Sequence, residues 1–434
     1  MVASRVSRAR LLVISGSSYD ADQVHISSVG PSRVLTAREH RKLPLWARWQ
    51  GGLEQRYTLG AEEEVMLLRP GDWSLAEISE TVIAGLPNDL SEHVAPETHA
   101  GVLELVTGVH TDVRGVMAEL NRLRDRFGHE LETMGLCAAT AGTHPLATRA
   151  DGQVSGSPRY RHVGESMRVL ARREPTMALH VHIGIPDPEE AVRVLNGLRR
   201  AAPVLLALSA NSPYWQGRDS GFASARTLIF QGFPRTGLPR RFDGYADYVE
   251  AVDPLIASEA VPDPSFLWWD VRLQPALGTV EVRIMDAQST LRHVGPLIAL
   301  VQSLAHLEIE GEPTAATPGA EVLAENRFLA ARDGMAARLI APQRHELVPV
   351  RDILDSLVAE CQPHAHALGC LDALDRLARA SFADGAERQR AVAARRGRRE
   401  DVVAGLAAQF RPRIARDANQ PHLNTHPSTT ERGG

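Results

Sequence analysis

Three short apolar segments each carry two ionisable residues separated by one position: Glu62 and Glu64 (57–68), His180 and His182 (177–185), and Glu281 and Arg283 (278–285). Side chains alternate between the two faces of a β-strand, so each pair shares one face and the apolar neighbours share the other. A fourth segment, GVLELVT, places Glu104 between Leu103 and Leu105. We expect these four strands to build one ionisable face over an apolar core.

A solvated sheet face would explain any one of these strands, but such a face normally also uses Thr, Lys, Ser and Gln. If the faces converge, the carboxylates repel each other and require cations. A set rich in oxygen ligands favours Mg²⁺ or Mn²⁺, with a histidine tolerated in the shell. The alternative is a zinc-dependent amidohydrolase using His180 and His182. Against it, the candidate ligands outnumber a four-coordinate zinc site and are mostly carboxylates.

The basic residues exclude two further kinds of chemistry. Of the 48 lysines and arginines, Lys42 is the only lysine in the 434 residues. A Walker A loop and a Schiff-base enzyme both need a lysine amine, and here either role would fall on Lys42. We therefore expect arginine, backbone N–H groups and metal ions to bind any phosphate. The net charge of -5 gives no reason to expect nucleic acid or a membrane as partner. Three scattered cysteines, and the lack of any run of about 20 apolar residues, predict a cytoplasmic protein.

The elements that must position these residues alternate irregularly, which favours an α+β fold. Hydrophobic periodicity predicts strands over 57–68, 102–107, 136–141, 177–185 and 278–285, and helices over 112–135, 188–209, 291–309, 319–340 and 351–378. We expect residues 1–55 to be a poorly ordered N-terminal extension, 56–410 one catalytic domain and 411–434 a disordered tail.

Read in order, the segments resemble the bacterial carboxylate–amine ligases of the type-2 glutamate–cysteine ligase family. The resemblance spans roughly residues 56 to 410 and is carried by LGAEEE (59–64), PETHAGVLELVTGV (96–109), AGTHP (141–145), LHVHIG (179–184), LSANSPYWQGRDSGFASART (208–227), FLWWDVR (266–272), TVEVRIMDAQ (279–288), ENRFLAARDG (325–334) and GAERQR (385–390). The chain departs from the family pattern at Ala225, where Tyr is common, and at Leu273-Gln274-Pro275, where the usual Pro is displaced.

The resemblance implies a glutamine-synthetase-like fold, a curved antiparallel sheet with helices on its outer face, and the use of ATP with two or more magnesium ions. By resemblance, Glu64, Glu97 and Glu104 hold the ion nearer the amino acid, and Glu62, His180 and Glu281 hold the ion nearer the nucleotide. His182 is then expected to contact a phosphate, and Arg283 the transferred phosphoryl group. Glu97 rests on resemblance alone, because a straight strand would place it on the face opposite to Glu104 unless the chain turns near Gly101.

The family also implies the reaction: ATP phosphorylates an amino-acid carboxylate, and an amine displaces the phosphate. We expect segment 215–227 to cover the site, with Arg226 binding a carboxylate or phosphate. The expected partners are a small amino acid and an amine acceptor, with weak glutamate–cysteine ligase activity, and a homodimer is expected at family level. A second alternative is a non-catalytic ATP-binding member of the fold, which retention of all the candidate ligands disfavours.

Overall fold

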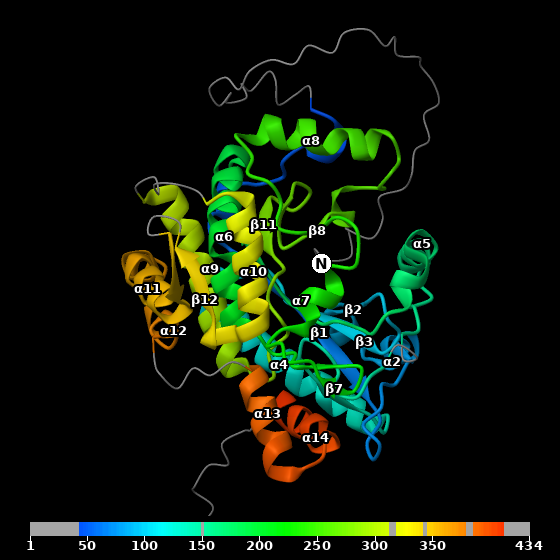
Figure 1. Ribbon diagram of the computed structural model, residues 1–434. Helices are drawn as coiled ribbons and strands as arrows, with labels where there is room; N and C mark the ends of the chain where they lie inside the picture. Colours follow the sequence, from blue (N-terminus) through cyan, green and yellow to red (C-terminus); the bar gives the residue numbers. More distant parts are fainter. Residues whose placement is uncertain (1–42, 149–151, 312–317, 342–344, 379–384, 412–434) are drawn as a thin grey trace, which may run out of the picture.

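A seven-stranded antiparallel sheet forms the centre of the protein in a computed structural model that describes residues 43–148, 152–311, 318–341, 345–378 and 385–411 (Figure 1). The strand order is β10-β11-β5-β1-β3-β2, and β4 also pairs with β1. The strands are β1 (Leu59–Leu68), β2 (Val94–Pro96), β3 (Val102–Val106), β4 (Cys137–Ala139), β5 (Leu179–Gly184), β10 (Val271–Gln274) and β11 (Thr279–Val282). The predicted α+β class and the strands around the ionisable residues are confirmed.

Helices surround this sheet, and some of them pack on its apolar face. In the described residues they are α2 (Ser79–Gly85), α3 (Asn88–Ser91), α4 (Val113–Thr133), α5 (Pro158–Met167), α6 (Pro188–Ser209), α7 (Ala225–Phe230), α8 (Tyr245–Ala257), α9 (Leu291–Glu310), α10 (Ala320–Asp333), α11 (Val350–Ala367), α12 (Leu371–Leu374), α13 (Gly385–Arg396) and α14 (Glu400–Phe410). Helix α6 contacts β10 and β11, α9 contacts β5, and α4 contacts β1. The largest core cluster joins Ala61, Val181 and Val280 of the sheet to these helices. Helices α4, α6 and α9 therefore cover the apolar face, and the opposite, ionisable face carries the candidate site.

Two long helices begin where the sequence supplies a cap. The Asp112 carboxylate accepts a hydrogen bond from Gly115 N, and Asp187 accepts from the backbone of Glu189 and Glu190. Such carboxylates satisfy backbone N–H groups that lack a partner in the first turn of a helix. The predicted helices 112–135, 188–209 and 291–309 are confirmed to within two residues at each end.

Two predicted helices are too long. The segment expected to be helical over 319–340 ends its α-helix at Asp333, because Gly334 adopts φ 55° and the chain turns. Strand β12 (Arg338–Ala341) then pairs with β13 (Glu346–Pro349). The helix predicted over 351–378 ends at Ala367, just before Gly369 at φ 69°. In both places a glycine provides the left-handed conformation that terminates the helix.

Part of the segment predicted to be a poorly ordered extension contacts the folded domain. Ala47 is fully buried, Trp46 Nε1 donates to Asp253 at 2.9 Å, and Trp49 Nε1 donates to the Ile185 carbonyl at 2.8 Å. Residues 43–55 therefore pack on the folded domain. Residues 1–42 of the predicted extension, and 412–434 of the predicted tail, lie outside the described residues.

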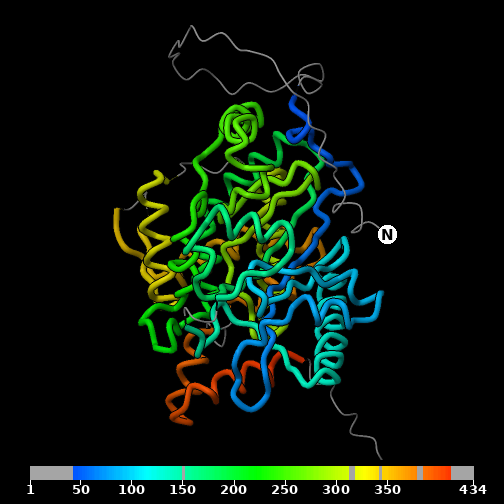
Figure 2. The backbone as a smooth tube through the Cα atoms, turned by 90° about the vertical axis from the view of Figure 1, so that its right-hand side faces the viewer, coloured from blue at the N-terminus to red at the C-terminus, as the bar shows by residue number. Residues whose placement is uncertain are grey.

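The C-terminal helices α13 and α14 lie at one end of the molecule in both views (Figures 1 and 2). Helix α14 contacts β4 and closes a smaller core with Val402, Val403 and Leu406. Among the helices that the structure describes, none is both long and apolar enough to cross a lipid bilayer.

Candidate active site

The strand register brings the predicted ionisable residues side by side. Glu62 pairs with His180, Glu64 pairs with Glu104, and His182 pairs with Glu281. Directly paired residues of antiparallel strands point to the same face, about 5 Å apart at Cβ. The sheet therefore brings four strands' ionisable residues together on one face, as the alternation predicted.

Two groups of side chains have the composition and spacing of a cation site. Glu62, His180 and Glu281 each offer a ligand atom within 4.8 Å of the others, and so do Glu64, Glu104 and His180. His180 lies between the groups: Nδ1 is 3.1 Å from Glu62 Oε2 and 3.6 Å from Glu104 Oε1, while Nε2 is 3.6 Å from Glu64 Oε1. The first group has the residues predicted for the nucleotide-side ion.

Glu281 is fully buried and held by three donors. Arg272 reaches both carboxylate oxygens, with Nε 2.7 Å from Oε2 and Nη2 3.2 Å from Oε1. Gln274 Nε2 donates to Oε2 at 2.7 Å, and Arg283 Nη1 donates to Oε1. Burial opposes ionisation, but Arg272 and Arg283 hold the pKa of Glu281 well below its usual range.

The carboxylates nearer β3, Glu64 and Glu104, have raised pKa values. Burial and the negative charge of Glu97 raise the pKa of Glu64 to about 8, against the pull of Arg226 and Arg283. Burial and the charges of Glu62, Glu97 and Glu64 likewise raise the pKa of Glu104 well above its usual range. Nearby carboxylates in low dielectric cannot all ionise without a compensating cation.

The pKa values of the two histidines shift in opposite directions. Burial and Arg283 lower the pKa of His180 to about 4, which favours the neutral imidazole that a metal ion binds. Although burial opposes it, Glu281 and Glu62 raise the pKa of His182. Despite its own burial, Glu62 has its pKa lowered by His182 and His180.

The donor set fits hard divalent cations. Nε2 of His180 and Nε2 of His182 are buried and make no well-directed hydrogen bond in the described structure, although His182 Nε2 lies 3.3 Å from Glu62 Oε1. Such unsatisfied buried atoms are costly unless a ligand pairs with them. Carboxylate oxygens with one imidazole suit Mg²⁺ or Mn²⁺. None of the groups found in the described residues combines both histidines, so the arrangement does not favour the predicted zinc alternative.

Glu97 reaches the site through a hairpin. It follows β2 directly, and β2 pairs with β3 so that Ala95 is opposite Glu104. Since Ala95 and Glu97 are two residues apart, the turn places Glu97 toward the Glu104 face, as the prediction required. Tyr160 of α5 donates its hydroxyl to Glu97 Oε1 at 3.2 Å, and Glu97 is absent from the two closely spaced groups. Its predicted role as an ion ligand stays a prediction.

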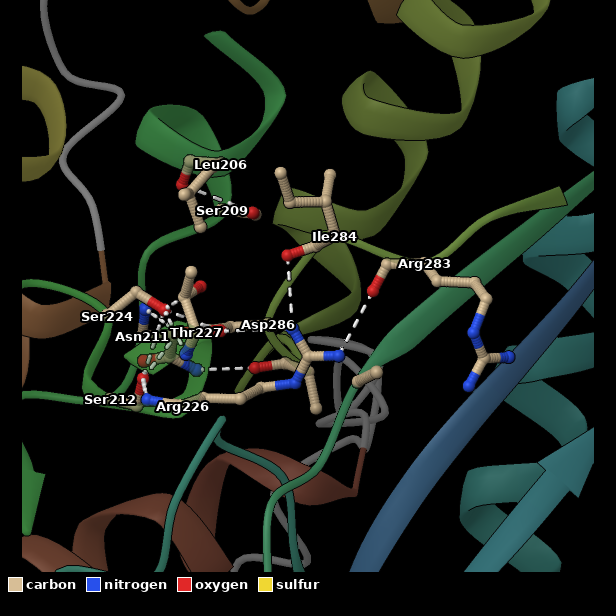
Figure 3. A network of polar contacts seen from close by, with 12 residues as sticks. Leu206, Ser209, Asn211, Ser212, Ser224, Arg226, Thr227, Arg283, Ile284 and Asp286 are labelled. Atoms are coloured by element: carbon tan, nitrogen blue, oxygen red, sulfur yellow. Dashed lines mark hydrogen bonds and ion pairs between the residues drawn. The ribbon is translucent and has the colours of Figure 1, made fainter. Parts of the chain in front are cut away.

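Arg226 lies beside two main-chain carbonyls and the buried Asp286 carboxylate. Its Nη1 donates to the Ile284 carbonyl at 3.1 Å and its Nη2 to the Arg283 carbonyl at 3.0 Å. Figure 3 shows that the Arg283 side chain points away from the Arg226 guanidinium. Asp286 lies on the same side, where it accepts from Ser212 Oγ at 2.6 Å and Ser224 Oγ at 3.0 Å. Arg226 Nη1 also lies 3.7 Å from Asp286 Oδ1. Arg226 therefore supports the chain that carries Arg283, and its predicted contact with a bound carboxylate or phosphate stays a prediction.

Segment 215–227 includes the turn between β6 (Tyr214–Trp215) and β7 (Arg218–Asp219). Arg390 of α13 holds this turn by donating to Asp219 Oδ1 at 2.8 Å and to the Phe222 carbonyl at 2.9 Å. Gln389, its neighbour, is buried and donates to Asn211 O at 2.9 Å. Gln389 and Arg390, in the GAERQR segment, therefore connect α13 to the chain between α6 and α7.

The sequence did not predict the structural roles of Arg272, Gln274 and Tyr160. Arg272 and Gln274 stand two apart in VRLQ, which is the same alternation that identified the other strands. Tyr160 had no comparable signal, because its role depends on how α5 lies beside the β2–β3 turn.

Comparison with known proteins gives a consistent result. The sequence profile of the family described as Glutamate-cysteine ligase family 2 matches residues 58–408. A protein of Rubrobacter xylanophilus named "Putative glutamate--cysteine ligase 2-1" is 40% identical over 361 residues, covering 83% of this chain and 96% of its own length. A Thermobifida fusca protein named "Putative glutamate--cysteine ligase 2" is 34% identical over 382 residues, covering 86% and 96%.

Solved structures share the fold at low sequence identity. A glutamate–cysteine ligase from Francisella tularensis in complex with AMP has a TM-score of 0.61 at 14% identity, covering 84% of this chain and 90% of its own. A bifunctional glutathione synthetase from Pasteurella multocida has a TM-score of 0.57 at 13% identity, covering 82% of this chain and 52% of its own. These likenesses agree with the predicted curved-sheet ligase fold.

Proposed function

The chain belongs to glutamate–cysteine ligase family 2, a family of ATP-dependent carboxylate–amine ligases, and on that premise we propose that it joins an amino-acid carboxylate to an amine through an acyl-phosphate at a two-ion site. Glutamate and cysteine are the proposed test substrates, because the relatives' names contain them. The carrying observation is that Glu62–His180–Glu281 and Glu64–Glu104–His180 lie on one sheet face and share His180.

A carboxylate does not react with an amine in neutral water, because its oxide is a poor leaving group. In the proposed first step a carboxylate oxygen attacks the γ-phosphorus of ATP, the bond to the β-phosphate oxygen breaks, and an acyl-phosphate and ADP form. In the second step the amine nitrogen attacks the acyl carbon, inorganic phosphate leaves, and the nitrogen loses a proton to give the amide.

The chain's residues divide this work by position. Glu62, His180 and Glu281 would hold one divalent ion, and Glu64 and Glu104 the other, with Glu97 nearby. Bound ions would neutralise the phosphate oxygens as charge develops. The largely buried Arg283 guanidinium, whose pKa Glu281 and Glu64 raise although its burial opposes this, stays charged and can donate to the transferred phosphoryl group.

Activity should be tested with Mg–ATP and amino-acid pools, by measuring ADP release and the product's mass. We expect ADP release to require an amino-acid carboxylate and an amine, and the product to have the summed mass of the two substrates less one water. Glutamate labelled with oxygen-18 in its side-chain carboxylate should transfer one label to inorganic phosphate, because that oxygen bridges carbon and phosphorus in the acyl-phosphate.

The result can contradict the proposal at two levels. Product formation without label transfer would exclude the acyl-phosphate while leaving a ligase. Amide hydrolysis that needs no ATP, with zinc held in the purified protein, would instead support the amidohydrolase alternative.

A further inference from the structure

Hydrogen-bond donors occupy both oxygens of the Glu281 carboxylate. Oε2 accepts from Arg272 Nε and Gln274 Nε2, and Oε1 accepts from Arg272 Nη2 and Arg283 Nη1. An ionised carboxylate offers two lone pairs on each oxygen, so these four bonds occupy the group. An ion can bind Glu281 only if one donor leaves.

Arg272 is the most firmly held of the three donors. Besides its two bonds to Glu281, its Nη1 donates to the carbonyls of Ser265 at 2.8 Å and Leu267 at 3.1 Å. Its side chain is buried on β10, directly opposite Glu281 in the register. Moving Arg272 would break four hydrogen bonds and leave two carbonyls without these donors.

Arg283 has fewer contacts. Its other contact is a 3.4 Å approach of Nη1 to His180 Nδ1, and its buried Nε lacks a hydrogen-bond partner in the described residues. His180 Nδ1 already lies 3.1 Å from Glu62 Oε2. Of the donors on Glu281 Oε1, Arg283 is therefore the one that can leave at the lower cost.

We propose that Arg272 is the positioning residue for Glu281, and that Arg283 occupies the place on Glu281 Oε1 that a divalent ion takes. The inference rests on the proposed ligase function and deepens it. When the ion binds, Arg283 leaves Oε1 while Arg272 keeps the carboxylate in its coordinating orientation. The freed guanidinium remains beside His180, on the side where the nucleotide phosphates are expected.

This exchange, in which the ion replaces Arg283 on Glu281 Oε1, predicts that Arg283 competes with the ion before nucleotide is present. Mn²⁺ binding should be measured by electron paramagnetic resonance and calorimetry, without nucleotide, for wild type, Arg283→Met, Glu281→Gln and the double variant. We expect Arg283→Met to tighten binding about tenfold, because it removes both a competing donor and a neighbouring positive charge. In the Glu281→Gln background the same change should alter affinity less than about twofold.

Several outcomes separate the exchange from a general charge effect. Arg235→Met removes a positive charge whose guanidinium contacts the Phe266 carbonyl and not the cluster, so it should leave Mn²⁺ affinity unchanged. An Arg283→Met gain that persists undiminished in the Glu281→Gln background would overturn the exchange, and so would no gain at all. Circular dichroism and thermal melting check that each variant folds.

A direct measurement on the wild-type chain avoids reliance on variants. In a crystal structure with Mg²⁺ and a non-hydrolysable ATP analogue, we expect Glu281 Oε1 to contact the ion, Arg272 to keep both bonds, and Arg283 to have left. Retention of Arg283 on Oε1 beside a bound ion would overturn the exchange and leave the ligase proposal standing. Absence of any ion site in this complex would overturn both.

The positioning role of Arg272 has its own test. Arg272→Lys keeps the charge but loses the two-pronged contact, so we expect Mn²⁺ affinity to fall about tenfold. A purely structural role would lower the melting temperature and leave affinity unchanged, and that result would overturn the assignment.

Discussion

At the scale of single residues, Glu281 combines two functions that are usually separate. It is a candidate ion ligand, and it is also the counter-ion of the buried Arg272 and the partly exposed Arg283. The same arginines that hold its pKa low occupy the oxygens that an ion would bind. Substitutions at Glu281 should therefore affect both catalysis and stability.

We expect Glu281→Gln to reduce ATP-dependent turnover about 100-fold or more, because an amide is a poor ligand for a hard cation. Since Arg272 then lacks a buried carboxylate partner, the free energy of unfolding should also fall by about 3 kcal/mol. Steady-state ADP release and urea unfolding measure the two effects. Glu92→Gln, on the exposed surface, is the matched control, and wild-type turnover in Glu281→Gln would refute the ligand role.

At the scale of elements, successive glutamates of β1 point to opposite faces of the sheet. Glu62 and Glu64 face the candidate site, while Glu63 faces helix α4, where Arg124 donates Nε to Oε2 at 2.8 Å and Nη2 to Oε1 at 2.7 Å. Both side chains are fully buried. Arg124 also donates to the carbonyls of Gln288 and Ser289, so it connects α4, β1 and the chain after β11.

Arg124→Met should lower the free energy of unfolding by about 3–5 kcal/mol, because it leaves the Glu63 charge buried without a partner. The double variant with Glu63→Gln should lose clearly less than the sum of the two single changes. Urea unfolding of the four proteins measures this coupling. A loss below about 1 kcal/mol for Arg124→Met would contradict the account of a buried, paired charge.

The contact between α13 and the end of α6 offers a second test at this scale. A Cβ at Gly385 would lie 1.9 Å from Asn211 Oδ1, and Gly385 N donates to the Ala210 carbonyl at 2.8 Å. We expect Gly385→Ala to lower the free energy of unfolding by about 1–3 kcal/mol through overpacking. Gly405→Ala in α14 meets no atom within 4 Å and should preserve or raise stability, which thermal melting can compare.

At the scale of the whole molecule, the stability of the fold at acidic pH depends in part on His293, a buried histidine outside the site. Burial, with Arg388 and Arg292 nearby, lowers the pKa of His293 to about 3. His293 lies in α9, where its Nδ1 is 2.8 Å from Thr290 Oγ1 and its Nε2 is 3.2 Å from Arg388 Nη1 of α13. The folded state therefore keeps this imidazole neutral under mildly acidic conditions.

Between pH 6.5 and about 3 the unfolded chain binds a proton at this position and the folded chain does not, so stability falls as pH falls. His293 alone should contribute a loss of about 1 kcal/mol between pH 7 and pH 5.5. Urea unfolding at both pH values should show a smaller loss in His293→Gln, with the exposed His366→Gln as control. An equal loss in all three proteins would contradict the assignment.

The sequence alone determined the ionisable face. Alternation with period two is a local property of the chain, so the faces of Glu62, His180, Glu281 and Glu104 could be assigned without knowing which strands pair. The residue types indicated cations, and the ordered segments indicated the family. The lengths of α10 and α11 were not determined, because Gly334 and Gly369 end their helices within otherwise periodic sequence.

Tertiary structure decided which of these side chains meet. The β2–β3 hairpin brings Glu97 to the Glu104 face although the two residues are seven apart. Strand register alone sets Arg272 opposite Glu281, and packing turns Arg226 toward main-chain carbonyls. Such contacts join residues distant in sequence, and their geometry depends on the whole packed sheet, whereas periodicity reports only which way each side chain points.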